Sequence, residues 1–400
     1  ICIFTHEVVM NSKERVKAVM NGAIPDKVPF GEFAIDFDTV GKVIGHDTYY
    51  RAKAKSQMAF WDGRRDEVVQ SWKEDGIEFY RKMDCFDIIN VSAMASGVAP
   101  PRGYECEKPS KIDSNTWEYL DGTVIKYSEL TADMTTVFDP NAGKVHRTPA
   151  DFEGEPDYVP EDESCFEVVD GLIDAFGGDR YVIGPCGHEV GIVLLDGDFG
   201  RGGGGFAQSL MAYYDNPETI RAAYRYEVAL NNLKDTQYIR HGQDAAFFGH
   251  QDFASTQGPF ISPDMFRDFA LDGITERVRN VHDHYNIPVF KHACGNNKPL
   301  LDMFAKAGYD AYQAVQQTAG MDIMALKEEY GDSMVPWGGL NVETLVSGKP
   351  DDVRKGVTYA MDNYKSGGRY IFGSSHSIAV GTQYDNFMAM VDEFVKRRDY

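Results

Sequence analysis

The chain lacks the features that define several common classes of protein. Its 400 residues contain no apolar run of about 18 residues, so no transmembrane helix and no membrane partner are expected. Residues 1–7 are too short for a secretory signal and lack its basic flank. Lysine and arginine are scarce, at 40 against 62 acidic residues, and the formal net charge is −22. Because phosphates require a basic face, nucleic-acid binding is not expected either.

Cysteine is also sparse. Six cysteines are spread along the chain without the dense spacing of a disulfide framework. Such thiols are typical of a reducing cytoplasm, which is the location that we expect, and they stay free for metal binding or catalysis. The apolar fraction of 43% is ordinary for a globular protein. The order of these apolar residues then indicates the fold.

Short apolar runs alternate with helical patterns along most of the chain. We expect strands at eight places, namely 28–35, 87–91, 180–184, 244–249, 287–291, 311–315, 334–338 and 369–373. Strands that alternate with helices form parallel sheets, and eight such units predict an α/β fold, a closed (β/α)₈ TIM barrel. An open doubly wound sheet is the competing fold, but its Gly-x-Gly-x-x-Gly turn does not follow the first run. We therefore expect one barrel domain over residues 1–400.

Residues 100–160 depart from this alternation. Within 117–127, two runs of alternating polarity flank Asp121-Gly122, which is a strong β-hairpin signal. We therefore expect a small antiparallel β insertion between the second and third strands of the barrel.

Polar side chains gather where the predicted strands end. In a TIM barrel the active site lies at the carboxyl ends of the strands, so side chains at these ends are candidate site residues. The strand ends carry Glu32, Asp36, Cys186, His188, Glu189, Asp252, His292, Cys294, Gln313 and His376. Their shared location predicts a metal site or an acid–base site.

His292 and Cys294 follow the fifth predicted strand as a His-x-Cys pair. Residues two apart in a strand point to the same side, so an imidazole and a thiolate could share one metal ion if the strand continues. The alternative is a strand end with a buried thiol and a hydrogen-bonded imidazole. Zinc accepts both donor types, and a catalytic zinc needs three protein ligands and an open position. The first candidate for the third ligand is His376, and the alternatives are Glu32, Cys186, His188 and Asp252.

From residue 180 onward the chain resembles the uroporphyrinogen decarboxylase superfamily. The blocks that carry this resemblance are Gln251-Asp252, 258–263, 292–295, 337–339, 372–378 and 385–387. The resemblance implies a (β/α)₈ barrel with one of two activities. One branch of the superfamily decarboxylates uroporphyrinogen without a cofactor, and the other contains zinc-dependent methyltransferases that work with corrinoids.

The chain departs from the pattern of each branch at one place. The decarboxylases hold propionate groups with an arginine-rich segment at the first strand, whereas residues 30–38 contain Glu32, Asp36 and Asp38 and no arginine. Three acids would repel a polycarboxylate, which argues against that branch. The methyltransferases carry His-x-Cys after strand five and a further cysteine after strand eight. This chain keeps His292 and Cys294, but no cysteine follows Cys294.

The missing thiolate has a chemical consequence. Zinc with two thiolates suits activation of a thiol, whereas zinc with one is harder and suits an oxygen. The resemblance and this departure together predict a zinc-dependent methyltransferase that moves the methyl group of an O-methylated compound to the corrinoid (cobalamin) of a partner protein. Glu32, His188 or Asp252 would protonate the leaving oxygen or orient the substrate.

Three alternatives stay open at this point. They are a cofactor-independent decarboxylase of a tetrapyrrole or another carboxylic acid, a methylcorrinoid:thiol methyltransferase, and a non-catalytic barrel that binds a tetrapyrrole or a corrinoid. For the substrate pocket, Phe253, Tyr312 and Trp337 are candidate aromatic walls, with plain core packing as the alternative.

Overall fold

A computed structural model describes residues 9–92, 97–142, 144, 146–195, 205–249 and 251–400. Its centre is a curled, seven-stranded parallel sheet of the TIM-barrel type, in the order β1-β6-β7-β10-β11-β12-β13. These strands are β1 (Ile88–Asn90), β6 (Tyr181–Gly184), β7 (Ala245–Phe248), β10 (Val289–His292), β11 (Ala311–Gln313), β12 (Val335–Leu340) and β13 (Ile371–Ser374). Each lies within or overlaps one of the predicted apolar runs, so the prediction of a parallel sheet is confirmed.

The remaining predicted strand, 28–35, makes only single bridges. Phe30 pairs in parallel with Phe372 of β13, and the amides of Asp87 and Ile88 beside β1 both donate to the Phe30 carbonyl oxygen. The segment therefore lies between the two edge strands and bonds to both. Its ladder is incomplete because Pro29 has no N–H to donate, and because the Phe30 N–H donates to the Asp87 side chain (2.8 Å).

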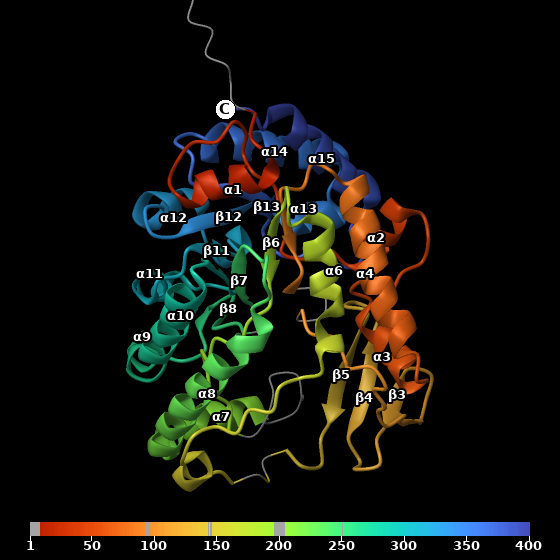
Figure 1. Cartoon of the computed structure of the whole chain (residues 1–400), viewed down its shortest axis with the longest axis vertical. Coiled ribbons are helices and arrows are strands. Elements are labelled where there is room, and N and C mark those ends of the chain that lie inside the picture. The colour runs from red at the N-terminus through yellow and green to blue at the C-terminus, as the bar shows by residue number, and fades with distance from the viewer. Residues whose placement is uncertain (1–8, 93–96, 143, 145, 196–204, 250) are drawn as a thin grey trace, which may run out of the picture.

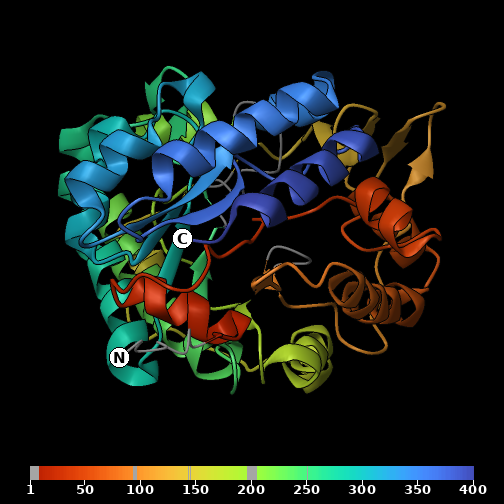
Figure 2. The ribbon, with the colours of Figure 1, turned by 90° about the horizontal axis from the view of Figure 1, so that it is seen from above.

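Helices surround the sheet (Figures 1 and 2). They are α1 (Ser12–Met20), α2 (Phe37–Ile44), α3 (Lys53–Trp61), α4 (Arg65–Lys82), α6 (Glu167–Phe176), α7 (Gly205–Asp215), α8 (Pro217–Tyr238), α9 (Pro263–Met265), α10 (Leu271–Tyr285), α11 (Leu301–Ala307), α12 (Ile323–Tyr330), α13 (Val342–Ser347), α14 (Pro350–Tyr364) and α15 (Tyr384–Arg397). Over the part of the chain that the structure describes, no helix has the length and apolar content needed to cross a membrane.

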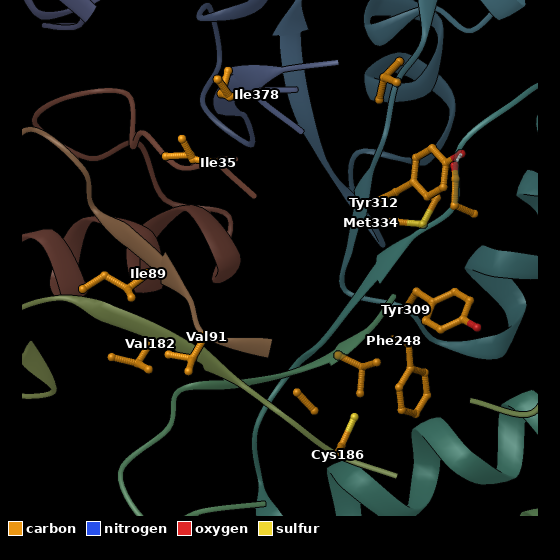
Figure 3. Close-up of a cluster of buried hydrophobic side chains, with 14 of the residues drawn as sticks. Ile35, Ile89, Val91, Val182, Cys186, Phe248, Tyr309, Tyr312, Met334 and Ile378 are labelled. Atoms are coloured by element: carbon orange, nitrogen blue, oxygen red, sulfur yellow. Dashed lines mark hydrogen bonds between the residues drawn. The ribbon is translucent and has the colours of Figure 1, made fainter. Parts of the chain in front are cut away.

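The sheet separates two hydrophobic clusters. Neighbouring residues of a strand point to opposite faces, so Ile183 and Phe290 belong to an inner cluster, whereas Val182 and Val289 belong to an outer one. Figure 3 shows part of the outer cluster, which packs between strands and helices. Val16 of α1 joins the inner cluster. Helix α1 thereby covers one end of the sheet. The candidate site residues lie at the opposite end, where the strands have their carboxyl ends.

Residues 110–138, which lie between β1 and β6 along the sequence, form a four-stranded antiparallel sheet. Its strands are β2 (Ser110–Lys111), β3 (Thr116–Glu118), β4 (Val124–Ser128) and β5 (Asp133–Phe138). Strands β3 and β4 form the hairpin that Asp121-Gly122 predicts, and Gly122 takes the positive φ of +85° that its turn requires. Lys53 of α3 forms an ion pair with Asp133 (3.0 Å). Figure 1 shows this sheet at the opposite end of the molecule from α1.

Candidate active site

Glu32 lies inside the sheet, next to the end of β13. Glu32 is 2% exposed, and its two carboxyl oxygens accept the Ser374 N–H at 3.1 and 3.0 Å. The Ser374 hydroxyl also donates to Oε2. Burial raises the pKa of Glu32 to about 8, although the Ser374 hydrogen bonds favour the ionised form. At neutral pH the carboxyl is therefore mainly protonated, and it can donate a proton to an oxygen.

His292 is the last residue of β10, and its ring is fixed on two sides. Nδ1 forms a hydrogen bond with the amide oxygen of Gln313, at the end of β11, so Nδ1 carries the proton and Nε2 keeps its lone pair. The ring stacks on Phe33 with centroids 3.9 Å apart. Burial lowers the pKa of His292 to about 3, which keeps the ring neutral. A neutral imidazole held through its other nitrogen is the form that binds metals.

Asp252 connects His292 with Cys294. Its Oδ1 lies 3.9 Å from His292 Nε2 and accepts the backbone N–H of Cys294 at 2.8 Å. Burial raises the pKa of the Cys294 thiol to about 12, and the Asp252 carboxylate adds to this effect. Strand β10 ends at His292, so Cys294 reaches the site from the following loop rather than from the strand. The two residues of the His-x-Cys pair thus share Asp252 as a neighbour.

His376, which follows β13, lies beside this group. Its ring centroid is 5.4 Å from that of His292 and 5.9 Å from that of Phe33. Burial lowers the pKa of His376, so it too is held neutral. The donor types therefore fit zinc, because neutral imidazole nitrogens and a thiol come together. Within the described ranges, however, no three His, Cys, Asp or Glu side chains are already arranged around a metal position.

His188 and Cys186 are held by other surroundings. The His188 N–H donates to Asn231 of α8 (2.7 Å), its carbonyl oxygen accepts from Arg277 of α10 (2.9 Å), and its Nδ1 accepts the Val190 N–H (3.1 Å). Cys186 is 2% exposed and lies in the outer hydrophobic cluster (Figure 3). The backbone of His188 is thus fixed by α8 and α10, and Cys186 is enclosed in the outer cluster.

The three candidate aromatic walls are core residues. Trp337 donates its indole N–H to the Gly31 carbonyl oxygen (2.9 Å). Tyr312 donates its hydroxyl to the Ala293 carbonyl oxygen (2.7 Å). Phe253 packs against other rings, and none of the three is exposed. The core-packing alternative is therefore correct, and the aromatic ring beside the site is that of Phe33.

Arg51 is a site residue that the sequence did not indicate. It comes from the loop between α2 and α3, and its Nε lies 3.1 Å from Oδ1 of Asp36. Its guanidinium carbon lies 5.6 Å from the centroid of Phe33. The segment 30–38 contains no arginine, but the fold brings one to it. No local pattern marks Arg51, since its position depends on the path of the loop.

A buried ion pair supports the site from the outer face of the sheet. Lys291 donates to Oε1 of Glu189 at 2.7 Å, and both side chains are fully buried. Lys291 also donates to the Gln251 carbonyl oxygen (3.0 Å). Gln251 precedes Asp252 and Lys291 precedes His292. The hydrogen bond from Lys291 to Gln251 therefore links the two segments that carry these site residues, and the ion pair with Glu189 holds Lys291 in place.

Comparisons with known proteins agree with this architecture. The family model for uroporphyrinogen decarboxylase (URO-D) matches residues 132–397. A uroporphyrinogen decarboxylase of Pseudomonas putida is 23% identical over 299 residues, which are 68% of this chain and 79% of that protein. A solved methyltransferase from Methanosarcina mazei superposes with a TM-score of 0.63 and 17% identity, over 97% of this chain and 99% of that one. This last likeness shows a shared fold.

Proposed function

The chain belongs to the uroporphyrinogen decarboxylase family, and we propose that within this family it is a zinc-dependent methyltransferase. It moves the methyl group of an O-methylated small molecule to a corrinoid held by a partner protein. The observation that carries the proposal is the state of His292, which is neutral, bound to Gln313 through Nδ1, and has its Nε2 3.9 Å from Asp252 Oδ1. A decarboxylase without a cofactor has no need of this arrangement.

We further propose that residues 1–400 form one (β/α)₈ barrel domain in which 100–160 is an antiparallel insertion. The hydrogen bonds of Phe30 to both edges of the sheet support closure of the barrel. The position of the antiparallel sheet between β1 and β6 supports the insertion.

His292 and Cys294 would hold the zinc ion, and His376 is the first candidate for the third ligand. When bound, the ion supplies a Lewis acid for the departing oxygen. A donor set with one thiolate keeps the ion hard enough for an oxygen, and no cysteine follows Cys294 to add a second. The donor set therefore favours an ether over a thiol, which places the methylcorrinoid:thiol alternative second.

Glu32 supplies the proton of the reaction. When the C–O bond breaks, the methyl group leaves without the bonding electrons, which stay on the oxygen. Glu32 is protonated at neutral pH and transfers its proton to this oxygen. The N–H and O–H of Ser374 then stabilise the carboxylate that remains. We assign this role to Glu32 rather than to His188, because burial holds the Glu32 carboxyl in its protonated form.

Asp252 has a different role, which is to position the loop of Cys294 relative to His292. It accepts the Cys294 N–H and lies beside His292, so it fixes the loop that carries the thiol relative to the imidazole. A carboxylate at this place also favours cationic ligands over anionic ones next to His292.

The second candidate function is decarboxylation. Family membership supports it, and so does Arg51, whose guanidinium is a suitable partner for a carboxylate. It predicts carbon dioxide release that needs no metal and no corrinoid.

One experiment separates these functions. The purified, zinc-loaded protein is incubated with cob(I)alamin and a panel of methoxylated compounds, and methylcobalamin is followed by its absorbance. A parallel sample receives uroporphyrinogen, and carbon dioxide is measured. We expect methylcobalamin from at least one methoxylated compound, no carbon dioxide, and loss of methyl transfer in Cys294→Ser. Carbon dioxide release without methyl transfer would contradict the proposal.

A further inference from the structure

Arg51 carries a buried guanidinium with unused hydrogen-bond donors. Its side chain is 12% exposed and that of its ion-pair partner Asp36 is 11% exposed. Nε faces Asp36 Oδ1 at 3.1 Å, whereas the buried Nη1 makes no hydrogen bond to any part of the chain that the structure describes. A guanidinium presents five N–H donors in a planar fork. Burial of such donors without partners costs free energy, which a ligand that accepts from them would recover.

Arg51 lies at the candidate active site rather than at a remote surface. Its guanidinium carbon is 5.6 Å from the centroid of Phe33, whose ring stacks on His292 at 3.9 Å and lies 5.9 Å from His376. The Phe33 ring therefore lies against both the guanidinium and the His292 ring. These groups border a single region of the strand ends.

The backbone of Arg51 is strained. Its φ of +52° lies in the left-handed region, which is unfavourable for a residue with a β-carbon. Such conformations persist where the surrounding structure enforces them, typically at ligand-binding sites. The strain agrees with a functional reason for presenting this side chain.

The positive charge of Arg51 is only partly balanced by the acidic side chains around it. Asp36 is the only acidic side chain within ion-pair distance of Arg51 in the described ranges, and its Oδ2 also accepts the Val380 N–H (3.1 Å). Burial raises the pKa of Asp36, which weakens it as a counter-ion. Lys53, which also acts on the charge of Asp36, is paired with Asp133 (3.0 Å). Arg51 is thus the cation that a ligand at Phe33 would meet.

We propose that Arg51 binds the carboxylate of the methyl donor, so the substrates are small methoxylated monocarboxylates. The two oxygens of a carboxylate match two N–H groups of the guanidinium fork. One guanidinium that is already paired with Asp36 suits a single carboxylate and would reject a polycarboxylate. This inference rests on the proposed function and names its substrate class.

Binding measurements test the proposal without the transfer reaction. Titration calorimetry on the zinc-loaded protein, without corrinoid, compares two acids with their neutral amides, namely 4-methoxybenzoate with 4-methoxybenzamide and methoxyacetate with 2-methoxyacetamide. We expect at least one acid to bind about 10–100-fold more tightly than its amide, as for a charged hydrogen bond. Arg51→Met should abolish this preference, and Arg51→Lys should restore part of it. Lys53→Met removes a neighbouring charge and should keep the preference.

Two results would overturn the proposal. One is equal binding of acid and amide by the unsubstituted protein, and this comparison does not depend on whether any variant folds. The other is an undiminished preference in folded Arg51→Met. The proposed function is tested separately, since methyl transfer from neutral ethers without a preference for acids would support that function while contradicting the role of Arg51. A preference for acids without methyl transfer would do the reverse.

Discussion

Glu32 accepts hydrogen bonds from Ser374, a residue 342 positions further along the chain. The contact joins segment 28–35 to β13, the last strand of the parallel sheet, and it places a carboxyl group where only 2% of the residue is exposed. The raised pKa of Glu32 follows from this burial, since water cannot solvate the charged form. Both the stability and the proposed chemistry therefore depend on the protonation of one group.

The stability of the protein should decrease as Glu32 is forced to ionise. Its pKa is about 8 in the folded state against 4.5 for a free carboxyl, so between these values the unfolded state binds fewer protons. The free energy of unfolding contributed by Glu32 is therefore complete below pH 4.5 and is lost as the pH rises toward 8. Glu32→Gln removes this dependence. In urea unfolding, its stability relative to the unsubstituted protein should rise across this window and then level off. Glu118→Gln, at an exposed position, should show no such trend.

The same substitution should impair methyl transfer. Loss of a general acid lowers kcat/KM by about 10²–10⁴-fold. In the unsubstituted protein kcat/KM should fall as the pH rises through about 8, where Glu32 loses its proton, and this fall should be absent from the residual rate of Glu32→Gln. A pH profile that is the same in both proteins would exclude Glu32 as the acid.

Much of the fold could be predicted from the sequence, because the relevant signals are local. Alternation of apolar runs and helical patterns marked the strands of the parallel sheet, and Asp121-Gly122 marked the hairpin of the separate antiparallel sheet. The rule that strand ends form the site of a parallel barrel was enough to group Asp252, His292 and His376. It also listed His188, since the rule locates a residue at a strand end but does not fix its side-chain partners.

The rest depended on long-range contacts that no local pattern encodes. The ladder of segment 28–35 is incomplete because the Asp87 side chain, rather than a backbone carbonyl, takes the Phe30 N–H. Arg51 reaches the site through a loop with a left-handed residue. Lys291 and Glu189 are 102 positions apart, and only the completed sheet brings them together.

Gln313 should control the affinity for zinc without contacting the ion. Its amide oxygen fixes the tautomer and orientation of His292. Loss of such an outer hydrogen bond typically lowers metal affinity about 10–100-fold. Gln313→Met keeps the size of the side chain and removes the acceptor. This variant should therefore release its zinc at a chelator concentration about 10–100-fold lower than the unsubstituted protein requires. Gln383→Met is the control, because Gln383 is exposed and lies before α15. Equal zinc affinity in the two variants would contradict this role.

The Lys291–Glu189 ion pair should be important for stability. Both side chains are fully buried, so Lys291→Met leaves a buried carboxyl without its partner. The expected loss in the free energy of unfolding is about 3–5 kcal/mol. The double variant Lys291→Met, Glu189→Gln removes both charges and should lose less than Lys291→Met alone. Urea unfolding of the unsubstituted protein, Lys291→Met, Glu189→Gln and the double variant measures this coupling. If the losses of the two single variants add up to that of the double variant, the two side chains do not interact.

The most direct test of the account is the zinc content of the purified protein and of its ligand variants. Elemental analysis should find roughly one zinc per chain, as for a catalytic site. His292→Ala and Cys294→Ser should lose this zinc, whereas Cys106→Ser, which replaces another partly buried free thiol, should keep it. An unsubstituted protein that transfers methyl groups without bound metal, or a Cys294→Ser protein with unchanged zinc, would contradict the assignment of His292 and Cys294 as the metal site.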